Sequence, residues 1–400
     1  MNPFRVGLLA HSFHRRNAAS LRSWHLGRAL AREGVDLRVY CAEGEVPSGH
    51  GEVPCAVREV GAVRRGFADR ADTVARVLQA RLGWTGPLVA TFHAKLRGRL
   101  PLARMAYTAL EEAEAKRPHD FLLAVWPDFE WTEAAARFSR AHRIPFAVEF
   151  QDPWAYFYEP RVRSHAHRAL RRALDDASFT LNVCEEWCAA DTRDFGLRSV
   201  CIPTGFWERP APPRMEDPAR PLRIVYAGSL WYFDLRPFAE GLRLARDRGV
   251  PWRFEYFGDD GPAVVHAFEA AGVAGQLDLR GRVGPDEVID ALSLADLLLL
   301  FTMPSKASTF GFKFAEVISR GLPVLLVGPD DPAVRVAAGK LVELHPCPDA
   351  ASVAAAVARV ACERPILPKP NPEAAAWTWP ALARRLVEAM KEAANRRGET

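Results

Sequence analysis

The stretch FGFKFAEVISRGLPVLLVGP, residues 310–329, predicts a helix that leads into a buried strand. The run of Val and Leu after Gly321-Leu322-Pro323 is typical of a parallel strand covered on both faces, so the helix before it belongs to a β-α-β unit. This helix carries one carboxylate, Glu316, which either binds a ligand or is simply solvated at a position that the helix dipole favours. The stretch therefore indicates an α/β fold and supplies a first candidate residue.

The same alternation of apolar strands and amphipathic helices runs through most of the chain. Strands are expected at residues 4–10, 35–42, 121–126, 144–150, 178–184, 222–228, 252–258, 277–281, 296–301 and 322–328. Helices are expected at residues 20–32, 131–142, 165–177, 236–249, 262–272 and 285–295, around Glu316, and after the proline-rich bend 364–372. Because strands that alternate with helices form mostly parallel sheets, we expect an α/β architecture throughout.

Chain length and a proline-rich segment indicate two domains. With 400 residues, 49% of them apolar, the chain can form two hydrophobic cores. The prolines of residues 203–221 prevent regular hydrogen bonding and stiffen this connection, which we take as the boundary. We expect a Rossmann-like N-terminal domain over residues 1–205 and a second Rossmann-like domain over 206–375. The two would face a cleft at the carboxyl ends of their strands, where α/β sheets bind ligands.

Composition excludes several classes of protein. The net charge is only +4, and we attribute the excess of Arg over Lys, 46 to 7, to a GC-rich genome rather than to nucleic-acid binding. The seven cysteines lack paired Cys-x-x-Cys spacing and the N-terminus lacks the flanks of a signal peptide, which indicates a reducing cytoplasm. The longest apolar run, near residues 297–301, is too short to span a bilayer. We therefore expect a cytoplasmic protein without a nucleic-acid partner, and the sequence leaves its oligomeric state open.

One basic stretch has three interpretations. Residues Arg58 to Arg104 include ten basic and three acidic side chains, with Leu, Phe and Trp between them. Such a stretch can attach loosely to an anionic membrane, which would place the protein at the inner face of the plasma membrane. It can equally bind a soluble anionic acceptor or form a solvated, Arg-rich face. The sequence does not decide among these.

Several motifs, in order along nearly the whole chain, resemble those of one enzyme family. The first half contains LAREGVDLRVYC (30–41), IPFAVEFQDPW (144–154) and LNVCEEWCAADTRDFGLRSVCIPTGF (181–206). The second half contains IVYAGSLW (224–231), RGRVGPDEVIDALSLADLLLLF (280–301) and KFAEVISRGLPVLL (313–326). In this order they resemble the two-Rossmann-domain (GT-B) glycosyltransferases, and most closely the retaining nucleotide-sugar enzymes of glycosyltransferase family four. The tail AAAWTWPALARRLVEAMKEA resembles the closing helix of that fold, which implies that residues 376–400 pack back on the N-terminal domain.

The resemblance implies a nucleotide-sugar donor held by the second domain. Glu316 would accept two hydrogen bonds from the ribose diol. Gly228 and Ser229 end a strand where backbone N–H groups can approach the diphosphate, with Lys313 and Arg236 as candidate cations. For Arg236 the alternative is a solvated helix residue. The donor-binding residues that we predict are Glu316, Lys313, Gly228, Ser229, Arg236, Arg282, Val283, Ser308, Thr309 and Gly311.

Four of these positions bear on the donor's identity. By resemblance, the backbone around Arg282 and Val283 meets the edge of the base, although Pro285-Asp286-Glu287 also fits an ordinary helix start. The family pattern usually has a second Glu eight positions before Glu316, and this chain has Ser308 there. A basic residue often follows the strand-ending Gly, where this chain has Ser229. The sequence therefore leaves the donor sugar and its base open.

The predicted acceptor and catalytic residues come from the first domain. The loop HSFHRRNAASLR, residues 11–22, follows the first strand and should overlook the cleft, where arginines would replace the glycines common in related loops. EFQDPWAYFY, residues 149–158, lies at another strand's carboxyl end, where Asp152 can orient a hydroxyl and Trp154 can stack on a sugar. The alternative there is a turn capped by the Asp, with the Trp in the core. We predict His11 and Asp152 as catalytic and Arg15, Arg16, Arg22, Glu149 and Trp154 as acceptor-binding.

The sequence therefore predicts a glycosyltransferase that moves a sugar from a nucleoside-diphosphate sugar to an acceptor hydroxyl. The acceptor would be a glycan, a lipid-linked group or a small molecule. The resemblance implies retention of anomeric configuration, no metal and no further cofactor. The alternatives are a sugar-nucleotide epimerase and a non-catalytic glycan- or partner-binding relative. A dehydrogenase is disfavoured because no Gly-x-Gly-x-x-Gly follows the first strand.

Overall fold

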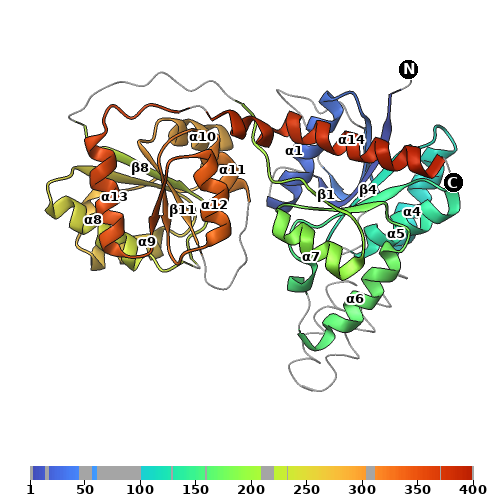
Figure 1. The fold of residues 1–400 in the computed structure, drawn as a ribbon, viewed down its shortest axis with the longest axis horizontal. Helices are drawn as coiled ribbons and strands as arrows, with labels where there is room; N and C mark the ends of the chain where they lie inside the picture. The colour runs from blue at the N-terminus through green and yellow to red at the C-terminus, as the bar shows by residue number, and fades with distance from the viewer. Residues whose placement is uncertain are drawn as a thin grey trace. The chain divides into compact units, whose positions relative to one another are not determined.

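The chain forms two compact units, each built on a parallel sheet. The computed structural model describes residues 3–13, 18–44, 56–60, 101–127, 129–157, 160–208, 220–231, 233–302, 311–369 and 371–398. One unit comprises Met1–Pro203 with Trp379–Thr400, and the other comprises Thr204–Thr378. Figure 1 shows the strands of both units between layers of helices. The α/β fold predicted from the sequence is confirmed for both units.

The first unit contains a seven-stranded parallel sheet in the order β3-β2-β1-β4-β5-β6-β7. Its strands are β1 (Arg5–Phe13), β2 (Asp36–Gly44), β3 (Ala56–Glu59), β4 (Phe121–Val125), β5 (Phe146–Glu149), β6 (Phe179–Asn182) and β7 (Ser199–Cys201). Its helices are α1 (Ala18–Arg32), α4 (Pro101–Glu114), α5 (Phe129–His142), the 3-10 helix η1 (Trp154–Phe157), α6 (Pro160–Leu174), α7 (Glu185–Phe195) and α14 (Trp379–Gly398). The strands β4, β5 and β6 are buried throughout, as expected for a sheet covered on both faces.

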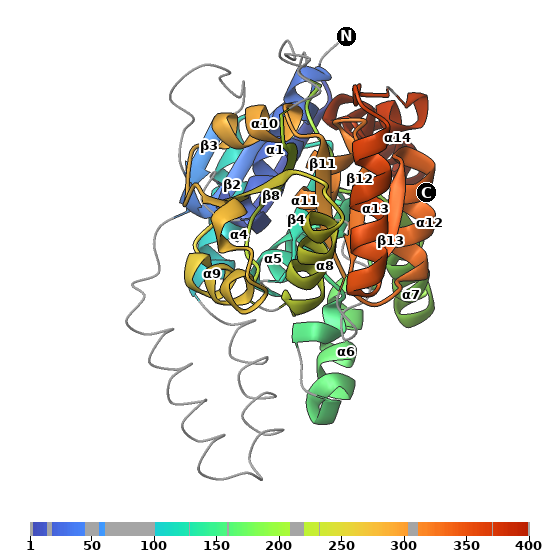
Figure 2. The same ribbon diagram turned by 90° about the vertical axis from the view of Figure 1, so that its left-hand side faces the viewer.

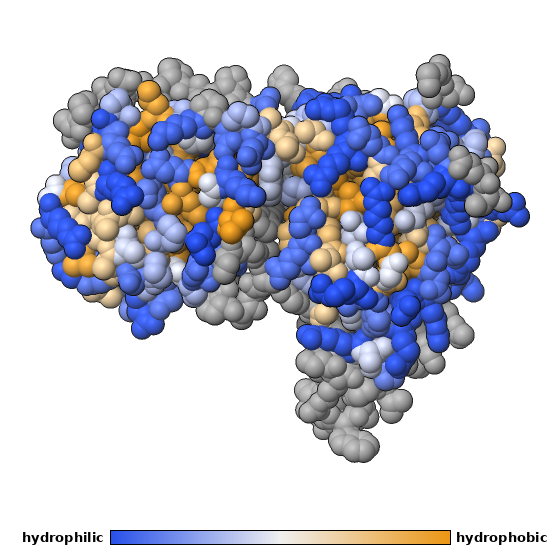
Figure 3. Space-filling view, in the orientation of Figure 1, coloured by the Kyte–Doolittle hydropathy of each residue, from blue (hydrophilic) through white to orange (hydrophobic). Residues whose placement is uncertain are grey.

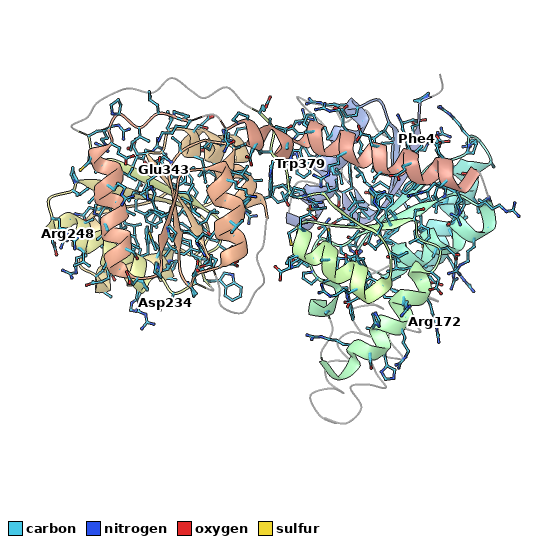
Figure 4. The ribbon with its side chains drawn as sticks, viewed as in Figure 1. Phe4, Arg172, Asp234, Arg248, Glu343 and Trp379 are labelled. Carbon is cyan, nitrogen blue, oxygen red and sulfur yellow. The ribbon has the colours of Figure 1, made fainter. Side chains whose placement is uncertain are left out.

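The last helix, α14, packs on α1, as the C-terminal sequence predicted. At its start the Trp379 ring stacks on His25 of α1, with ring centroids 5.6 Å apart and planes 19° from parallel. Arg384 pairs with Glu33 at 3.0 Å, just after α1. Figures 1 and 4 show the helix running along the first unit, with Trp379 labelled at its beginning. The two ends of the chain therefore fold into one domain.

The second unit contains a six-stranded parallel sheet in the order β10-β9-β8-β11-β12-β13. Its strands are β8 (Leu222–Ala227), β9 (Trp252–Phe257), β10 (Leu277–Leu279), β11 (Leu297–Phe301), β12 (Val324–Val327) and β13 (Leu344–Cys347). Its helices are α8 (Arg236–Asp247), α9 (Gly261–Ala270), α10 (Pro285–Ser293), α11 (Phe312–Ile318), α12 (Pro332–Leu341) and α13 (Ala350–Cys362), with 3-10 helices η2 (Ala274–Gln276) and η3 (Pro372–Trp377). Figures 1 and 2 both show α8 and α13 side by side, and the two helices are in contact.

The turn at Gly321 connects α11 to β12, the two elements of the opening stretch. Gly321 has a φ of +62°, a conformation that favours glycine. A Cβ atom at this position would also lie 2.5 Å from the carbonyl oxygen of Lys369, whose N–H donates to the Gly321 carbonyl at 2.8 Å. Glycine is therefore required at position 321 both by the backbone conformation of the turn and by the close approach of the segment at Lys369.

Hydrophilic side chains cover much of the face in Figure 3, with hydrophobic patches between them. No helix in the described parts of the chain is long and apolar enough to cross a bilayer. Most of the basic stretch Arg58–Arg104 lies outside the described residues, so its predicted association with a membrane stays a prediction.

Candidate functional site

The strand order of the second unit identifies where a ligand is expected. From β8 the chain proceeds to β9 and β10 on one side, and from β11 to β12 and β13 on the other. The connections therefore reverse between β8 and β11, and the crevice outside the carboxyl ends of such strands is the usual ligand site of an α/β sheet. The loop after β8 begins with Gly228 and Ser229, two of the predicted donor-binding residues.

Lys313 lies directly against this loop. It belongs to the first turn of α11, and its ammonium donates to the Tyr226 hydroxyl at 2.8 Å and to the Ser229 carbonyl at 3.1 Å. It also lies 5.0 Å from the centre of the Tyr226 ring. Burial lowers the pKa of Lys313 to about 8, although Glu316 and Asp260 act in the opposite direction. The structure thus joins Lys313, Gly228 and Ser229, which the sequence placed in one site.

A second connection, between the loops after β8 and β9, was not predicted. The Asp260 carboxylate accepts hydrogen bonds from the Leu230 N–H at 2.6 Å and from the Tyr256 hydroxyl at 3.2 Å. Tyr256 also accepts from the Asp260 N–H at 3.1 Å. Gly258 permits this close approach, because a Cβ there would lie 2.7 Å from the Gly228 carbonyl oxygen. Asp260 and Tyr256 therefore fix the loop that bounds the site.

Glu316 follows Lys313 by one turn of α11 and remains partly exposed. Desolvation raises the pKa of Glu316 to about 7, against the attraction of Arg320 and Lys313. In the described part of the chain no hydrogen bond reaches its carboxylate, while the Glu316 backbone carbonyl accepts from Ser319. A partly exposed carboxylate that no hydrogen bond among the described residues occupies can accept two hydrogen bonds from a ligand.

The other predicted donor-binding residues lie in three places. Arg236 begins α8, is largely exposed, and makes a bidentate ion pair with Asp234, which Figure 4 labels. Arg282 and Val283 lie in the loop after β10, where Arg282 is 3.5 Å from Asp259. Gly311 is the exposed N-cap residue of α11. Ser308 and Thr309 lie outside the described residues.

We predict that Gly228→Ala destabilises the second unit by about 2–4 kcal/mol, because backbone strain adds to the hydrogen bonds that Lys313 gives up when its flexible end moves away from the new methyl group. The φ of Gly228 is +122°, and an added Cβ would lie 2.2 Å from Cε of Lys313. Chemical denaturation would measure the loss. Gly249→Ala is the matched control, since Gly249 has a φ of +81° with no atom within 4 Å of the added Cβ, and it should cost only about 1–2 kcal/mol.

The role of Lys313 in this strain can be isolated. In a Lys313→Ala background the added Cβ at position 228 no longer meets the lysine stem, so the penalty of Gly228→Ala should shrink toward that of the control. An undiminished penalty in the double variant would show that Lys313 does not pack against Gly228.

In the first unit, two predicted acceptor-binding residues form a buried ion pair. Arg22 of α1 is 3% exposed and Glu149 at the end of β5 is 0% exposed. The guanidinium binds Glu149 Oε1 at 2.8 Å through Nε and through Nη2, and Nη2 also donates to the Ile202 carbonyl at 2.7 Å. It lies 5.9 Å from the centre of the Trp379 ring. The two side chains are thus engaged with each other, and their contact with an acceptor stays a prediction.

The remaining residues predicted in the first unit are spread along the carboxyl ends of its strands. Trp154 is buried: its Nε1 donates to Asp194 at 2.8 Å and its ring stacks on His167 with centroids 5.3 Å apart. This is the core packing that the sequence offered as an alternative. Asp152, after β5, and His11, in β1, are exposed. Arg15 and Arg16 lie outside the described residues.

Within the described ranges, no three His, Cys, Asp or Glu side chains are grouped so that they could hold a metal ion. The site in the second unit is instead built from one ammonium, one carboxylate, two tyrosines and closely spaced backbone. Such a set suits an anionic ligand that also carries hydroxyl groups.

Comparison with solved structures identifies the fold as the two-domain GT-B fold of glycosyltransferases. A glycosyltransferase from Rickettsia africae ESF-5 matches with a TM-score of 0.62 and 11% identity over 98% of this chain and 99% of that one. The lipopolysaccharide outer core galactosyltransferase WaaB matches with a TM-score of 0.60 and 11% identity over 97% and 99%. Anabaena Alr3699/HepE, solved in complex with UDP, matches with a TM-score of 0.57 and 12% identity over 99% and 100%.

No protein-family model matches the sequence, and no curated protein matches it either. At identities of 11–12% the structural likeness establishes the fold alone. The assignment to glycosyltransferase family four stays a prediction.

Proposed function

We propose that the protein is a glycosyltransferase that moves a sugar from a nucleoside-diphosphate sugar to an acceptor hydroxyl. The observation that carries this proposal is the pairing of Lys313 and Glu316 one turn apart on α11, beside Gly228 at the point where the sheet connections reverse. The solved structures of the same fold support it, since one of them is in complex with UDP and another with UDP-glucose. We further propose that the reaction retains anomeric configuration and needs neither a metal nor another cofactor.

Each group of the site has a part in this proposal. Glu316 accepts the two ribose hydroxyl protons, and Lys313 turns from Tyr226 and Ser229 to the diphosphate. The lysine then stabilises the negative charge that grows on the leaving diphosphate as the glycosidic bond breaks. The first unit receives the acceptor, with Asp152 and His11 as the exposed groups able to orient its hydroxyl. The acceptor is a glycan, a lipid-linked group or a small molecule.

Affinity for the nucleotide sugar should be highest between about pH 7 and pH 8 and should fall on both sides of this range. Glu316 accepts two hydrogen bonds only when ionised, so affinity should fall as the pH drops below its pKa of about 7. Lys313 binds the diphosphate only when protonated, so affinity should also fall above its pKa of about 8. Calorimetry with UDP-glucose would measure this, since its diphosphate has no group that titrates near neutral pH. Glu316→Gln should abolish the fall in affinity at low pH, and Lys313→Ala should abolish the fall at high pH. If either variant kept the pH dependence of wild type, the role assigned to that residue would be contradicted.

A ligand panel tests the proposed function directly. Melting temperatures are measured with UDP, GDP, dTDP, ADP and CMP, each with and without EDTA, because a ligand that binds only the folded protein raises the melting temperature. One diphosphate that stabilises the protein regardless of EDTA is the expected result. Stabilisation lost with EDTA would contradict the metal-free site, and no stabilisation by any nucleotide would contradict the proposed function.

A further inference from the structure

Trp231 is the most exposed large hydrophobic residue in the described part of the chain. Its exposed fraction is 73%, whereas its neighbour Leu230 is 1% exposed. An indole that stays exposed does not give the protein the hydrophobic stabilisation that its burial would provide, which is among the largest of any side chain. Trp231 lies two residues after Ser229, whose carbonyl accepts a hydrogen bond from Lys313, in the loop that follows β8 at the carboxyl edge of the sheet.

The loop that carries Trp231 is fixed on both sides. Before it, the Leu230 N–H donates to Asp260 at 2.6 Å and the Leu230 side chain is buried. After it, the Phe233 ring stacks on Phe301 at the end of β11, with centroids 5.0 Å apart and planes 29° from parallel. The Phe233 N–H also donates to the Leu230 carbonyl at 3.0 Å, which closes a turn with Trp231 inside it. The contacts of Leu230 and Phe233 thus hold the turn in a conformation that leaves Trp231 exposed.

The position of this turn indicates which ligand the indole meets. The turn follows β8, and its anchors Asp260 and Phe301 follow β9 and end β11, so it lies at the carboxyl ends of the strands where the sheet connections reverse. The cation and the carboxylate of the site, Lys313 and Glu316, belong to the same unit and suit the diphosphate and ribose of a donor. The donor's remaining part is a pyranose, whose C–H face packs well on an aromatic ring that can also donate a hydrogen bond.

We propose that Trp231 stacks on the pyranose ring of the donor sugar and contributes to the choice of that sugar. This inference rests on the proposed glycosyltransferase function and adds a sugar contact to it. It assigns the nucleotide to Lys313 and Glu316, and the sugar to the loop after β8.

The test compares a nucleotide with its own sugar conjugate. Affinities for UDP and UDP-glucose, or for GDP and GDP-mannose where the panel selects guanine, are measured by calorimetry for wild type, Trp231→Phe and Trp231→Ala. Trp231→Ala should bind the nucleotide sugar about tenfold more weakly, and the nucleotide as wild type does. Trp231→Phe should lie between the two, because it keeps a smaller aromatic face. Leu367→Ala, which truncates another exposed apolar residue of the same unit, should change neither affinity.

Each other outcome overturns the inference in a distinct way. An equal loss for nucleotide and nucleotide sugar would place Trp231 against the nucleotide, and no loss for either would remove it from the site. Melting temperatures of the variants without ligand would show whether a loss of affinity reflects lost stability instead. Wild-type protein that binds no nucleotide of the panel would refute the proposed function itself, whereas wild-type binding with unaffected variants would refute only the role of Trp231.

Discussion

Glu316→Ala should weaken binding of the nucleoside diphosphate by roughly a hundredfold or more, because it removes two charge-assisted hydrogen bonds to the ribose. The structure supports this size of effect, since the carboxylate is desolvated and no hydrogen bond within the described residues occupies it. Calorimetry with the best nucleotide of the panel would measure the change. The 2′-deoxy form of the same nucleotide should bind the variant and the wild type with much closer affinities, because it lacks one of the two hydroxyls.

Stability measurements separate this loss from unfolding. The pKa of Glu316 in the folded protein is about 7, above the ordinary value of 4.5, so folding favours its neutral form. Its ionisation therefore costs stability progressively as the pH rises from 4.5 to 7, and the cost is complete above 7. Glu316→Gln should consequently be at least as stable as wild type at pH 8 while binding nucleotide poorly. A variant that binds normally at pH 8 would exclude Glu316 from the site.

The strands predicted from the sequence are those with long apolar runs. The FLLAV run of β4 and the LLLLF run of β11 are buried in the middle of their sheets, where both faces are covered and a continuous apolar run is expected. The missed strands β3, β7 and β13 lie at the edges of the two sheets and are only three or four residues long. The missed helix α7 begins with two glutamates and has few apolar residues, which conceals its period. The missed helices α4, α12 and α13 are rich in alanine, so their apolar faces stand out little from the rest.

The proximity of predicted site residues follows from the sequence more directly in the second unit than in the first, for a physical reason. Lys313 and Glu316 lie one turn apart on one helix, so their proximity follows from sequence spacing. Arg22 and Glu149 are far apart in sequence, and nothing in either segment shows that they bind each other. Asp260 and Tyr256 were missed because their role depends on the neighbouring β8 loop, whose approach only the folded sheet reveals. Sequence spacing therefore identified contacts within an element better than contacts between elements.

Arg22→Ala should destabilise the first unit by about 3–5 kcal/mol, because it leaves Glu149 as a buried charge without its partner. One oxygen of that carboxylate, Oε2, already lacks a hydrogen bond among the described residues. Arg22 also binds the Ile202 carbonyl and lies over Trp379, so its loss removes a contact shared by α1, β5, the segment after β7 and the start of α14. Chemical denaturation, followed by circular dichroism, would measure the change in the free energy of unfolding.

An exposed ion pair to the same helix provides the control for this prediction. Arg198 binds Glu392 of α14 at 2.7 Å, and both side chains are 50% exposed. Because solvent screens such a pair, Arg198→Ala should change stability by less than about 1 kcal/mol. The double variant Arg22→Met with Glu149→Met removes both buried charges and should recover much of the stability that Arg22→Ala loses. If Arg22→Ala were no more costly than Arg198→Ala, the buried pair would have little structural importance, and Arg22 and Glu149 would again be candidates for binding an acceptor.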